Sequence, residues 1–188
     1  MVAPHVYDLK GYPKDVALQD GTRVLLKPMT PDDADALLEF FRSIPAEDWY
    51  YLKEQVTSPE VIERWAAELN YDRALPLMAW SNNKVVADAS LHRTRAVARH
   101  HVGEVRVIVA PEFRHKGLGT KVMQELVSLA RRRGLERLLL EVVADKEGGA
   151  IALAESMGFV KLAVLPGYAK DLEGDAKDVI MFDLRLEY

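Results

Sequence analysis

The sequence predicts a mixed α/β (α+β) fold, in which one mixed sheet of about seven strands carries helices on both faces. Three observations predict it. The 188-residue chain has the length of a single domain. Segments with the apolar patterns of strands lie between segments with helical periodicity. The expected order is β-α-α-β-β-β-α-β-α-β-β, which does not alternate strictly and therefore disfavours a doubly wound nucleotide-binding fold.

The first half of the chain contributes one strand and two helices. Thr22 to Lys27 is a strand candidate that follows an Asp20-Gly21 turn. Thr30-Pro31 and Ser58-Pro59 each place a capping residue before a proline, which predicts the starts of two helices. Apolar residues follow both starts at helical spacing, so each helix is expected to bury one face.

The second half begins with a hairpin, in which Ser81-Asn82-Asn83 joins two apolar strands. The longest helix is expected to end at Gly134, where a left-handed cap belongs. The expected elements are strands at 75–80, 84–91 and 103–109, a helix at 117–133, a strand at 135–143, a helix at 149–157, and strands at 159–165 and 179–186.

Composition narrows the possible classes of protein. Residues 1–20 show no clear periodicity and are expected to form an N-terminal arm, with residues 21–188 as the folded domain. A net charge of −4 argues against a general nucleic-acid binder. The absence of cysteine excludes disulfides, thiolate metal sites and a cysteine nucleophile. No stretch is long and apolar enough to span a membrane, and the first residues do not resemble a signal peptide. A cytoplasmic protein is therefore expected.

The segment most informative about chemistry is a basic, glycine-rich turn between a strand and the longest helix. Arg114-His115-Lys116 supplies basic side chains, and Gly117 and Gly119 let the backbone approach a ligand. A helix N-terminus also offers free N–H groups and a partial positive charge. This combination predicts a phosphate or pyrophosphate site. The spacing fits neither a P-loop nor a Rossmann fingerprint, and the alternative is an ordinary tight turn with solvated basic residues.

The same segment resembles the acetyl-coenzyme A binding motif of the GNAT superfamily of N-acetyltransferases. Arg114-x-x-Gly117-x-Gly119 follows Val107-Ile108-Val109, and a later short helix ends in Gly158-Phe159, as in that family. The element order agrees from Gly21 to Leu186. The resemblance implies a mostly antiparallel sheet that splays beyond the strand ending at Val109, and acetyl-CoA as co-substrate without a metal.

The resemblance also implies roles for particular residues. Val107, Ile108 and Val109 would lie along the pantetheine arm, and a backbone N–H near Val109 would stabilise the oxyanion formed during acyl transfer. Residues 114–120 would wrap the pyrophosphate. The cofactor-binding residues expected in that loop are Arg114, His115, Lys116, Gly117, Leu118, Gly119 and Thr120.

A closer resemblance concerns the acceptor. The run from Val16 to Asp33, followed by Phe40-Phe41, is similar to the entry of the acetyltransferase domain of bacterial protein-lysine acetyltransferases. The larger nucleotide-binding region that those proteins often carry has no counterpart in this sequence.

Two residues are candidates for proton transfer. An alkyl amine is almost entirely protonated at neutral pH, so its attack on a thioester benefits from a base. Glu104 matches the glutamate of the lysine-acetyltransferase pattern, and its alternative role is an ion pair with Arg93 or Arg95. The tyrosine with which many family members protonate the thiolate is replaced by Ala154. Tyr168 is a possible substitute, although packing is the more common role of such a tyrosine.

Charge suggests the kind of acceptor. Residues 32–72 contain 11 acidic and 3 basic side chains, whereas residues 114–137 contain 7 basic and 2 acidic ones. One interpretation is a cationic acceptor such as a polyamine, a small amine or a protein lysine, drawn by the acidic helices. The alternative is two ordinary solvated helix faces.

The predicted function is direct N-acetyl transfer to a primary amine within a ternary complex. The alternative class is a non-catalytic acyl-CoA-binding sensor, which the missing tyrosine and a missing asparagine in the 145–149 region leave open. Nucleic-acid binding through Arg131, Arg132 and Arg133 is disfavoured, since those arginines suit the end of a helix. No nucleic-acid or membrane partner is expected, and a homodimer is possible.

Overall fold

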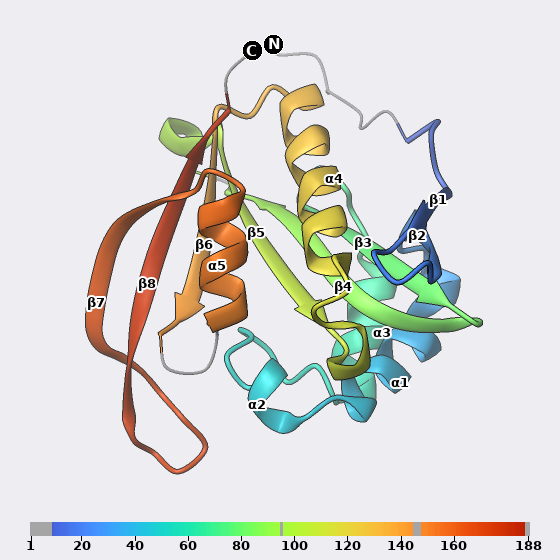
Figure 1. Ribbon diagram of the computed structural model, residues 1–188, viewed down its shortest axis with the longest axis horizontal. Coiled ribbons are helices and arrows are strands. Elements are labelled where there is room, and N and C mark those ends of the chain that lie inside the picture. The colour runs from blue at the N-terminus through green and yellow to red at the C-terminus, as the bar shows by residue number, and fades with distance from the viewer. Residues whose placement is uncertain (1–8, 95, 145–147, 187–188) are drawn as a thin grey trace.

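A twisted sheet of eight strands forms the centre of the molecule, with helices on both faces (Figure 1). The computed structural model describes residues 9–94, 96–144 and 148–186. The strands are β1 (Lys14–Ala17), β2 (Arg23–Pro28), β3 (Ala74–Ser81), β4 (Lys84–Arg93), β5 (Val102–Val109), β6 (Arg137–Val143), β7 (Val160–Lys170) and β8 (Ala176–Arg185). The α-helices are α1 (Ala34–Ser43), α2 (Ala46–Trp49), α3 (Pro59–Ala67), α4 (Leu118–Arg132) and α5 (Gly148–Ser156).

The strands lie in the order β1-β2-β3-β4-β5-β6-β8-β7. Only the β5–β6 pair is parallel, and the remaining pairs of the described chain are antiparallel. The expected mixed, mostly antiparallel sheet is therefore confirmed. The parallel pair is central to the site, because the chain between its two strands contains the glycine-rich turn and α4.

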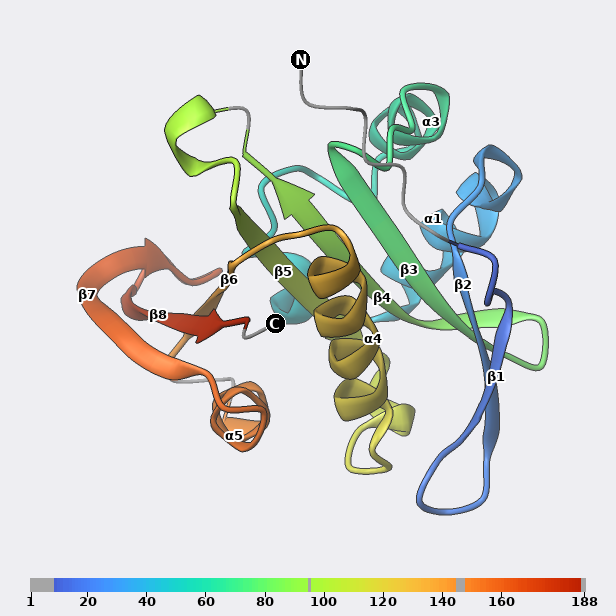
Figure 2. The same cartoon turned by 90° about the horizontal axis from the view of Figure 1, so that it is seen from above.

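The two faces of the sheet carry separate cores. Helices α4 and α5 cover one face, and α1 and α3 cover the other (Figure 2). Leu118, Val122, Leu126 and Leu129, the predicted apolar face of the longest helix, are all fully buried against the sheet. On the opposite face Leu37, Phe41 and Ile62 build a second core around Met78. Burial of these stripes is the main stabilisation of the helices, since helices this short are marginal alone.

The expected turns form as their residues require. Asn82 and Asn83 have φ angles of 48° and 60° and close the β3–β4 hairpin, since asparagine tolerates the left-handed region. Gly134 has a φ angle of 75° and ends α4, with Leu135 N–H donating to Ala130 O. This is the predicted left-handed cap.

The structure differs from the sequence prediction at three elements. Residues 14–17, expected in an irregular arm, form β1, which pairs with β2. A further short helix, α2, lies between the two predicted helices. Tyr168, expected in a loop after Pro166-Gly167, lies within β7, because the strand continues through a register shift between Leu165 and Ala169. The sheet consequently has eight strands rather than about seven.

Candidate active site

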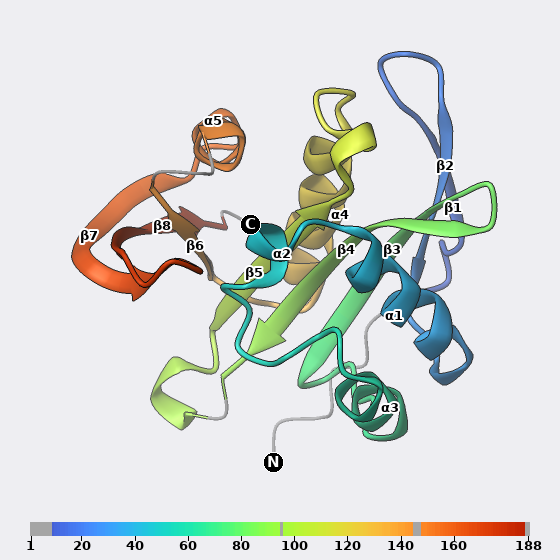
Figure 3. The ribbon, with the colours of Figure 1, turned by 90° about the horizontal axis from the view of Figure 1, so that it is seen from below.

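The sheet opens between β5 and β6. Their parallel pairing covers only Val102 to Glu104 on β5 and Arg137 to Leu139 on β6, so the two strands separate beyond Glu104. The α4 N-terminus and α2 lie at the same end of the sheet as this opening (Figure 3). The resemblance implied such a splay, and the structure places its start partway along β5.

The α4 N-terminus supplies unused hydrogen-bond donors at the opening. Gly117 is the N-cap with a φ angle of 84°, a conformation that favours glycine, and Lys121 N–H donates to Gly117 O. Within the described chain, the backbone N–H groups of Leu118, Gly119 and Thr120 donate to no protein group. The first turn of α4 also contains no acidic residue. Three free amides at the positive end of a 15-residue helix fit a pyrophosphate.

The basic side chains of the turn are engaged with the protein. Arg114 Nη2 lies 2.6 Å from Asp48 of α2, and Arg114 Nε donates to Val109 O at 3.1 Å. Lys116 lies 3.1 Å from Asp20. His115 is exposed and has a φ angle of 57°. The backbone N–H groups are therefore free to bind a phosphate, whereas two of the basic side chains of this turn bind neighbouring segments of the protein.

The backbone of β5 alternates between its two neighbours. Ala110 N–H donates to Val86 O, so the even-numbered residues of β5 exchange hydrogen bonds with β4. The backbone groups of Val107 and Val109 consequently face the opening toward β6. Ile108 has the other orientation, and its side chain lines a pocket on the α1–α3 face. The geometry thus favours Val107 and Val109 over Ile108 as backbone contacts for a ligand in the opening.

That pocket has a volume of about 350 Å³ and lies between the surface of β4 and β5 and the helices α1 and α3. Asp88, Ser90 and His92 alternate along β4 and line it, as does Arg106 of β5. The β4–β5 register places Arg106 beside Ser90 and Glu104 beside His92. One face of two adjacent strands therefore presents a set of polar side chains to a cavity next to the sheet opening.

Glu104 is held by two cations. Arg106 Nη2 donates to Glu104 Oε1 at 2.6 Å, and Lys53 Nζ lies 3.1 and 3.2 Å from the two carboxylate oxygens. Burial alone would raise the pKa of Glu104, but hydrogen bonds and charge from Arg106 and Lys53 outweigh it and lower the pKa. These are not the partners considered from sequence: Arg93 forms no ion pair with Glu104, and Arg95 lies outside the described residues.

Asp88 and His92 are strongly perturbed, and sequence reasoning missed both. Burial raises the pKa of Asp88 to about 7, against the opposing charge of Arg106, and Asp88 Oδ1 is buried without a hydrogen-bond partner. Burial, followed by the charge of Arg106, lowers the pKa of His92 to about 4. His92 Nε2 lies 2.8 Å from Ser90 Oγ. The available signal was three polar residues at every second position of an otherwise apolar strand.

Tyr168 is not brought to this pocket. It lies on β7, the outermost strand, with 71% of its surface exposed, and β8 and β6 separate β7 from β5. Ala154, at the position of the family's tyrosine, belongs to α5 and is fully buried in the core. Residues 145–147, part of the region with the missing asparagine, lie outside the described residues.

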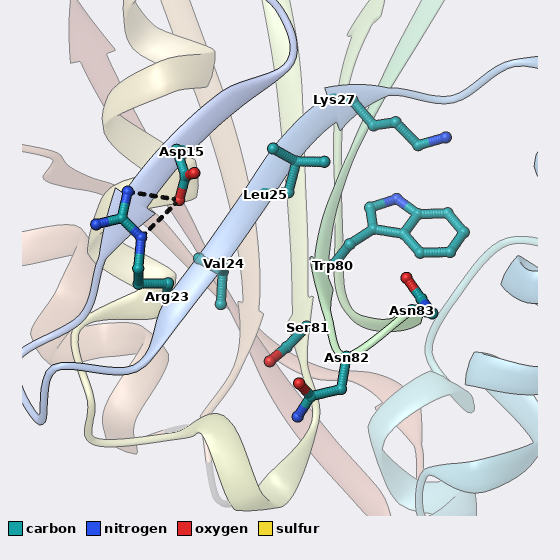
Figure 4. A pocket seen from close by; sticks show the side chains of 9 residues that line it. All are labelled: Asp15, Arg23, Val24, Leu25, Lys27, Trp80, Ser81, Asn82 and Asn83. Carbon is teal, nitrogen blue, oxygen red and sulfur yellow. Dashed lines mark hydrogen bonds and ion pairs between the residues drawn. The ribbon is translucent and has the colours of Figure 1, made fainter.

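A second cavity, of about 450 Å³, is a surface groove at the other end of the sheet order (Figure 4). It lies between β2 and the β3–β4 turn, where the Lys27 ammonium stacks 4.6 Å from the centre of the Trp80 ring. Asp15 pairs with Arg23 at its rim. The groove contains neither the free amides of α4 nor the perturbed carboxyl groups.

Other features bear on the remaining predictions. The described residues include no cluster of His, Cys, Asp and Glu suited to a metal ion, and no described helix is long and apolar enough to cross a membrane. Arg133 has a side chain only 3% exposed and pairs with Asp72. Arg133 is therefore not available to bind nucleic acid, which removes one of the three arginines on which the nucleic-acid hypothesis depended.

Comparison with known proteins identifies the family. Residues 38–159 match the model of the acetyltransferase (GNAT) family. The [ribosomal protein bS18]-alanine N-acetyltransferase of Escherichia coli (strain K12) is 26% identical over 132 residues, covering 70% of this chain and 86% of that protein. The crystal structure of ribosomal-protein-alanine N-acetyltransferase from Brucella melitensis superposes with a TM-score of 0.76 at 26% identity, covering 86% of this chain and 99% of that one.

A protein from Salmonella typhimurium, solved with its cofactor acetyl-CoA, superposes with a TM-score of 0.75 at 20% identity. The match covers 88% of this chain and 95% of that one and is a likeness of fold. The orphaned α4 amides and the opening beside β5 fit the same coenzyme. The family match covers well over half of the sequence and includes the glycine-rich turn. The chain therefore belongs to the acetyltransferase (GNAT) family and is an acetyl-CoA-dependent N-acetyltransferase.

Proposed function

We propose that the protein transfers the acetyl group of acetyl-CoA directly to the primary amine of an acceptor while both substrates are bound. The observation that carries this proposal is the adjacency of two sites, the opening with its free α4 amides and the polar pocket on the β4–β5 face. Coenzyme and acceptor can thus approach β5 from different sides. The chain has no cysteine to form a thioester intermediate, which favours direct transfer over a ping-pong route.

The coenzyme would be held chiefly by backbone. The N–H groups of Leu118, Gly119 and Thr120 would bind the pyrophosphate, with the rest of the 114–120 turn around it. Val107 and Val109 would contact the pantetheine arm. The Val109 N–H would donate to the thioester carbonyl oxygen and polarise it. The Val109 carbonyl oxygen is already occupied, because it accepts a hydrogen bond from Arg114. Acetyl-CoA supplies an activated acetyl group as a thioester.

Two carboxyl groups of the site could accept the proton that the acceptor amine loses. Glu104 is adjacent to the point where β5 and β6 separate, but its lowered pKa makes it a weak base while Arg106 and Lys53 hold it. Asp88 has a pKa near neutrality, which suits a group that accepts a proton at pH 7. We propose Glu104 as the base next to the reacting amine and Asp88 as a second proton acceptor within the pocket. Glu104→Gln should abolish turnover and preserve coenzyme binding. Unchanged turnover would exclude Glu104 as the base, whereas coenzyme binding without turnover in the wild type would favour the non-catalytic sensor.

The charge of the pocket bears on the acceptor. Five basic residues and three acidic residues line it, and His92 is neutral at pH 7, so the lining carries a net charge of +2 with Asp88 ionised. The net charge is +1 when the Glu104 carboxylate beside Lys53 and Arg106 is counted as well. This lining does not favour a polyamine or another multiply cationic acceptor. We propose an amine that also carries an anionic group, as the α-amine of an amino acid does. The relatives' names specify an alanine of a ribosomal protein, which is an α-amine whose carboxyl group lies in a peptide bond. They support an α-amine as acceptor, and the anionic group is proposed from the charge of the pocket alone.

A matched pair of acceptors tests this charge preference. L-Alanine and L-alaninamide present the same α-amine with and without a carboxylate, and a lysine peptide and spermidine provide cationic comparisons. Release of coenzyme A thiol, measured as kcat/KM, should favour the carboxylate. A preference for spermidine or the lysine peptide would contradict the anionic acceptor and restore the cationic interpretation.

Calorimetric titration with acetyl-CoA tests the coenzyme site separately. Gly119 is a poor position for an added anion, because a Cβ there would lie 3.3 Å from the Leu153 side chain. Thr120→Glu is cleaner: a glutamate in the first turn suits the helix dipole but repels a pyrophosphate. Gln124→Glu, an exposed position one turn further along α4, is the matched control. Wild type and control should bind and Thr120→Glu should not; equal binding by all three would exclude this site.

A further inference from the structure

The protein brings a primary amine of its own to the candidate base. Lys53 belongs to the segment between α2 and α3, 51 residues before Glu104. Its Nζ contacts both carboxylate oxygens of Glu104, at 3.1 and 3.2 Å, and Lys53 also lines the acceptor pocket. Its side chain remains 61% exposed, so it reaches the site as a flexible arm rather than as packed structure. An acceptor amine would have to occupy much the same position.

This contact distinguishes Lys53 from other lysines in ion pairs. Lys14 pairs with Glu125, Lys84 with Glu39 and Lys116 with Asp20, and none of those carboxylates lies on β5. Structurally, Glu104 does not need Lys53, because Arg106 already binds it through two hydrogen bonds. The ion pair of Lys53 with Glu104 contributes little to stability, since an exposed ion pair is worth about 0–1 kcal/mol. Its more important consequence is that it places an amine beside the candidate base.

We propose that Lys53 is an acceptor in cis, so that the protein acetylates its own Lys53 when no external acceptor occupies the pocket. This inference rests on the proposed acetyl transfer. The Lys53 ammonium gives a proton to Glu104, and the neutral nitrogen forms a bond to the acetyl carbonyl carbon. The carbon–sulfur bond of the thioester breaks, and coenzyme A leaves with the electron pair of that bond as the thiolate. The nitrogen gives its second proton to this thiolate as the amide forms. The products are acetyl-Lys53, coenzyme A as its thiol, and protonated Glu104, which returns its proton to solvent.

Acetylation would change the site in two ways. The amide of acetyl-lysine carries no charge, so Glu104 would lose one of its two cations and its pKa would rise toward a value better suited to a base. The net charge of the pocket lining would also fall from +2 to +1. The modified protein would then be a faster catalyst with a weaker preference for anionic acceptors.

The test is incubation of the full chain with acetyl-CoA alone, followed by peptide mass spectrometry over time. Lys84 is the internal control, because it is 75% exposed and also faces a carboxylate, Glu39, 3.7 Å away. Positioning beside a base should make acetylation of Lys53 faster than that of Lys84 by about 10²-fold or more. The first-order rate constant should not change on tenfold dilution of the protein, as transfer within one molecule requires.

Variants complete the test. Glu104→Gln should reduce acetylation of Lys53 to the Lys84 level, and Lys53→Arg, which keeps the cation, should remove the acetyl group from the intact-mass spectrum. Lys84→Arg should leave the Lys53 rate unchanged. Acetylation of Lys53 at the Lys84 rate, or a rate constant proportional to protein concentration, would overturn the inference.

The two failures can be told apart. If the protein binds acetyl-CoA and releases thiol with an added amine while Lys53 stays unmodified, only the inference about Lys53 is wrong. If acetyl-CoA does not bind in the calorimeter, the proposed function is wrong and the inference is overturned with it.

Discussion

Replacement of Asp88 by asparagine should stabilise the protein more at high pH than at low pH. The pKa of this carboxyl is about 7 in the folded protein, against an ordinary value of 3.8 for the unfolded chain. Between these two pH values the folded state retains the proton while the unfolded chain loses it. Wild-type stability therefore falls as pH rises from about 4 to 7, by about 1.4 kcal/mol per pH unit. The full penalty is about 4 kcal/mol. Asparagine resembles the protonated form and does not titrate.

The measurement is the thermal midpoint of wild type and Asp88→Asn at pH 5 and pH 8. The pH dependence of the difference is the useful quantity, because any fixed effect of the amide cancels. Between pH 5 and 8 the difference should grow by about 3 kcal/mol, or about 6–12 °C for a domain of this size. Asp32→Asn, at an exposed carboxyl in the turn before α1, is the control and should show no such growth. A difference that is constant with pH, or that shrinks, would refute the reasoning.

The same variant connects stability with function. If Asp88 accepts a proton during turnover, Asp88→Asn should reduce kcat by about 10²-fold at pH 8. The protein would then be more stable and less active. That pairing is expected of a buried carboxyl retained for chemistry, since an unpartnered oxygen such as Asp88 Oδ1 otherwise only costs stability. Greater stability with full activity would leave Asp88 without a part in proton transfer.

Three further outcomes are expected. Gly103→Ala should lower the free energy of unfolding in urea by about 1–3 kcal/mol, because the added Cβ would lie 2.9 Å from three leucine side chains; Gly149→Ala, with open space around it, should not. The pKa of His92 is depressed to about 4, so wild type should lose stability as pH falls from 6.5 to 4, and His92→Gln should lack that part of the acid sensitivity. Tyr168→Phe should keep kcat within about twofold, because the exposed β7 hydroxyl does not line the acceptor pocket; a loss of about 10²-fold would instead support Tyr168 as the general acid.

Local patterns predicted most of the fold. The apolar stripe of α4 and the asparagine turn of the β3–β4 hairpin each depend on a few consecutive residues, and both formed as expected. The strand β1 was missed because its four residues form an edge strand with little burial to mark it. Tyr168 was misplaced because Gly167 suggested a loop, whereas the strand accommodates it through a register shift.

The parts of the site that are contiguous in sequence were also predicted, whereas the parts assembled from distant residues were not. The glycine-rich turn is contiguous in sequence and was predicted as a unit. The pocket depends on which face of β4 carries Asp88 and His92, and on the register that sets Arg106 beside Ser90. Contacts such as that between Lys53 and Glu104 join residues 51 positions apart. Neither register nor such pairings follow from periodicity, which fixes only the alternation of faces.

The charge of the acceptor site shows how a count along the chain and a count around the pocket lead to different expectations. The segment 32–72 is strongly acidic, yet several of its carboxylates are used by the fold: Asp33 binds Lys27 and Thr30, Asp48 binds Arg114, and Asp72 binds Arg133. The pocket that the same segment covers has more basic than acidic side chains in its lining, five against three. A charge summed along the chain describes the far field of a surface, whereas an acceptor meets the few groups within a Debye length of about 8–10 Å. The substrate preference should therefore follow the lining of the pocket rather than the composition of the helices above it.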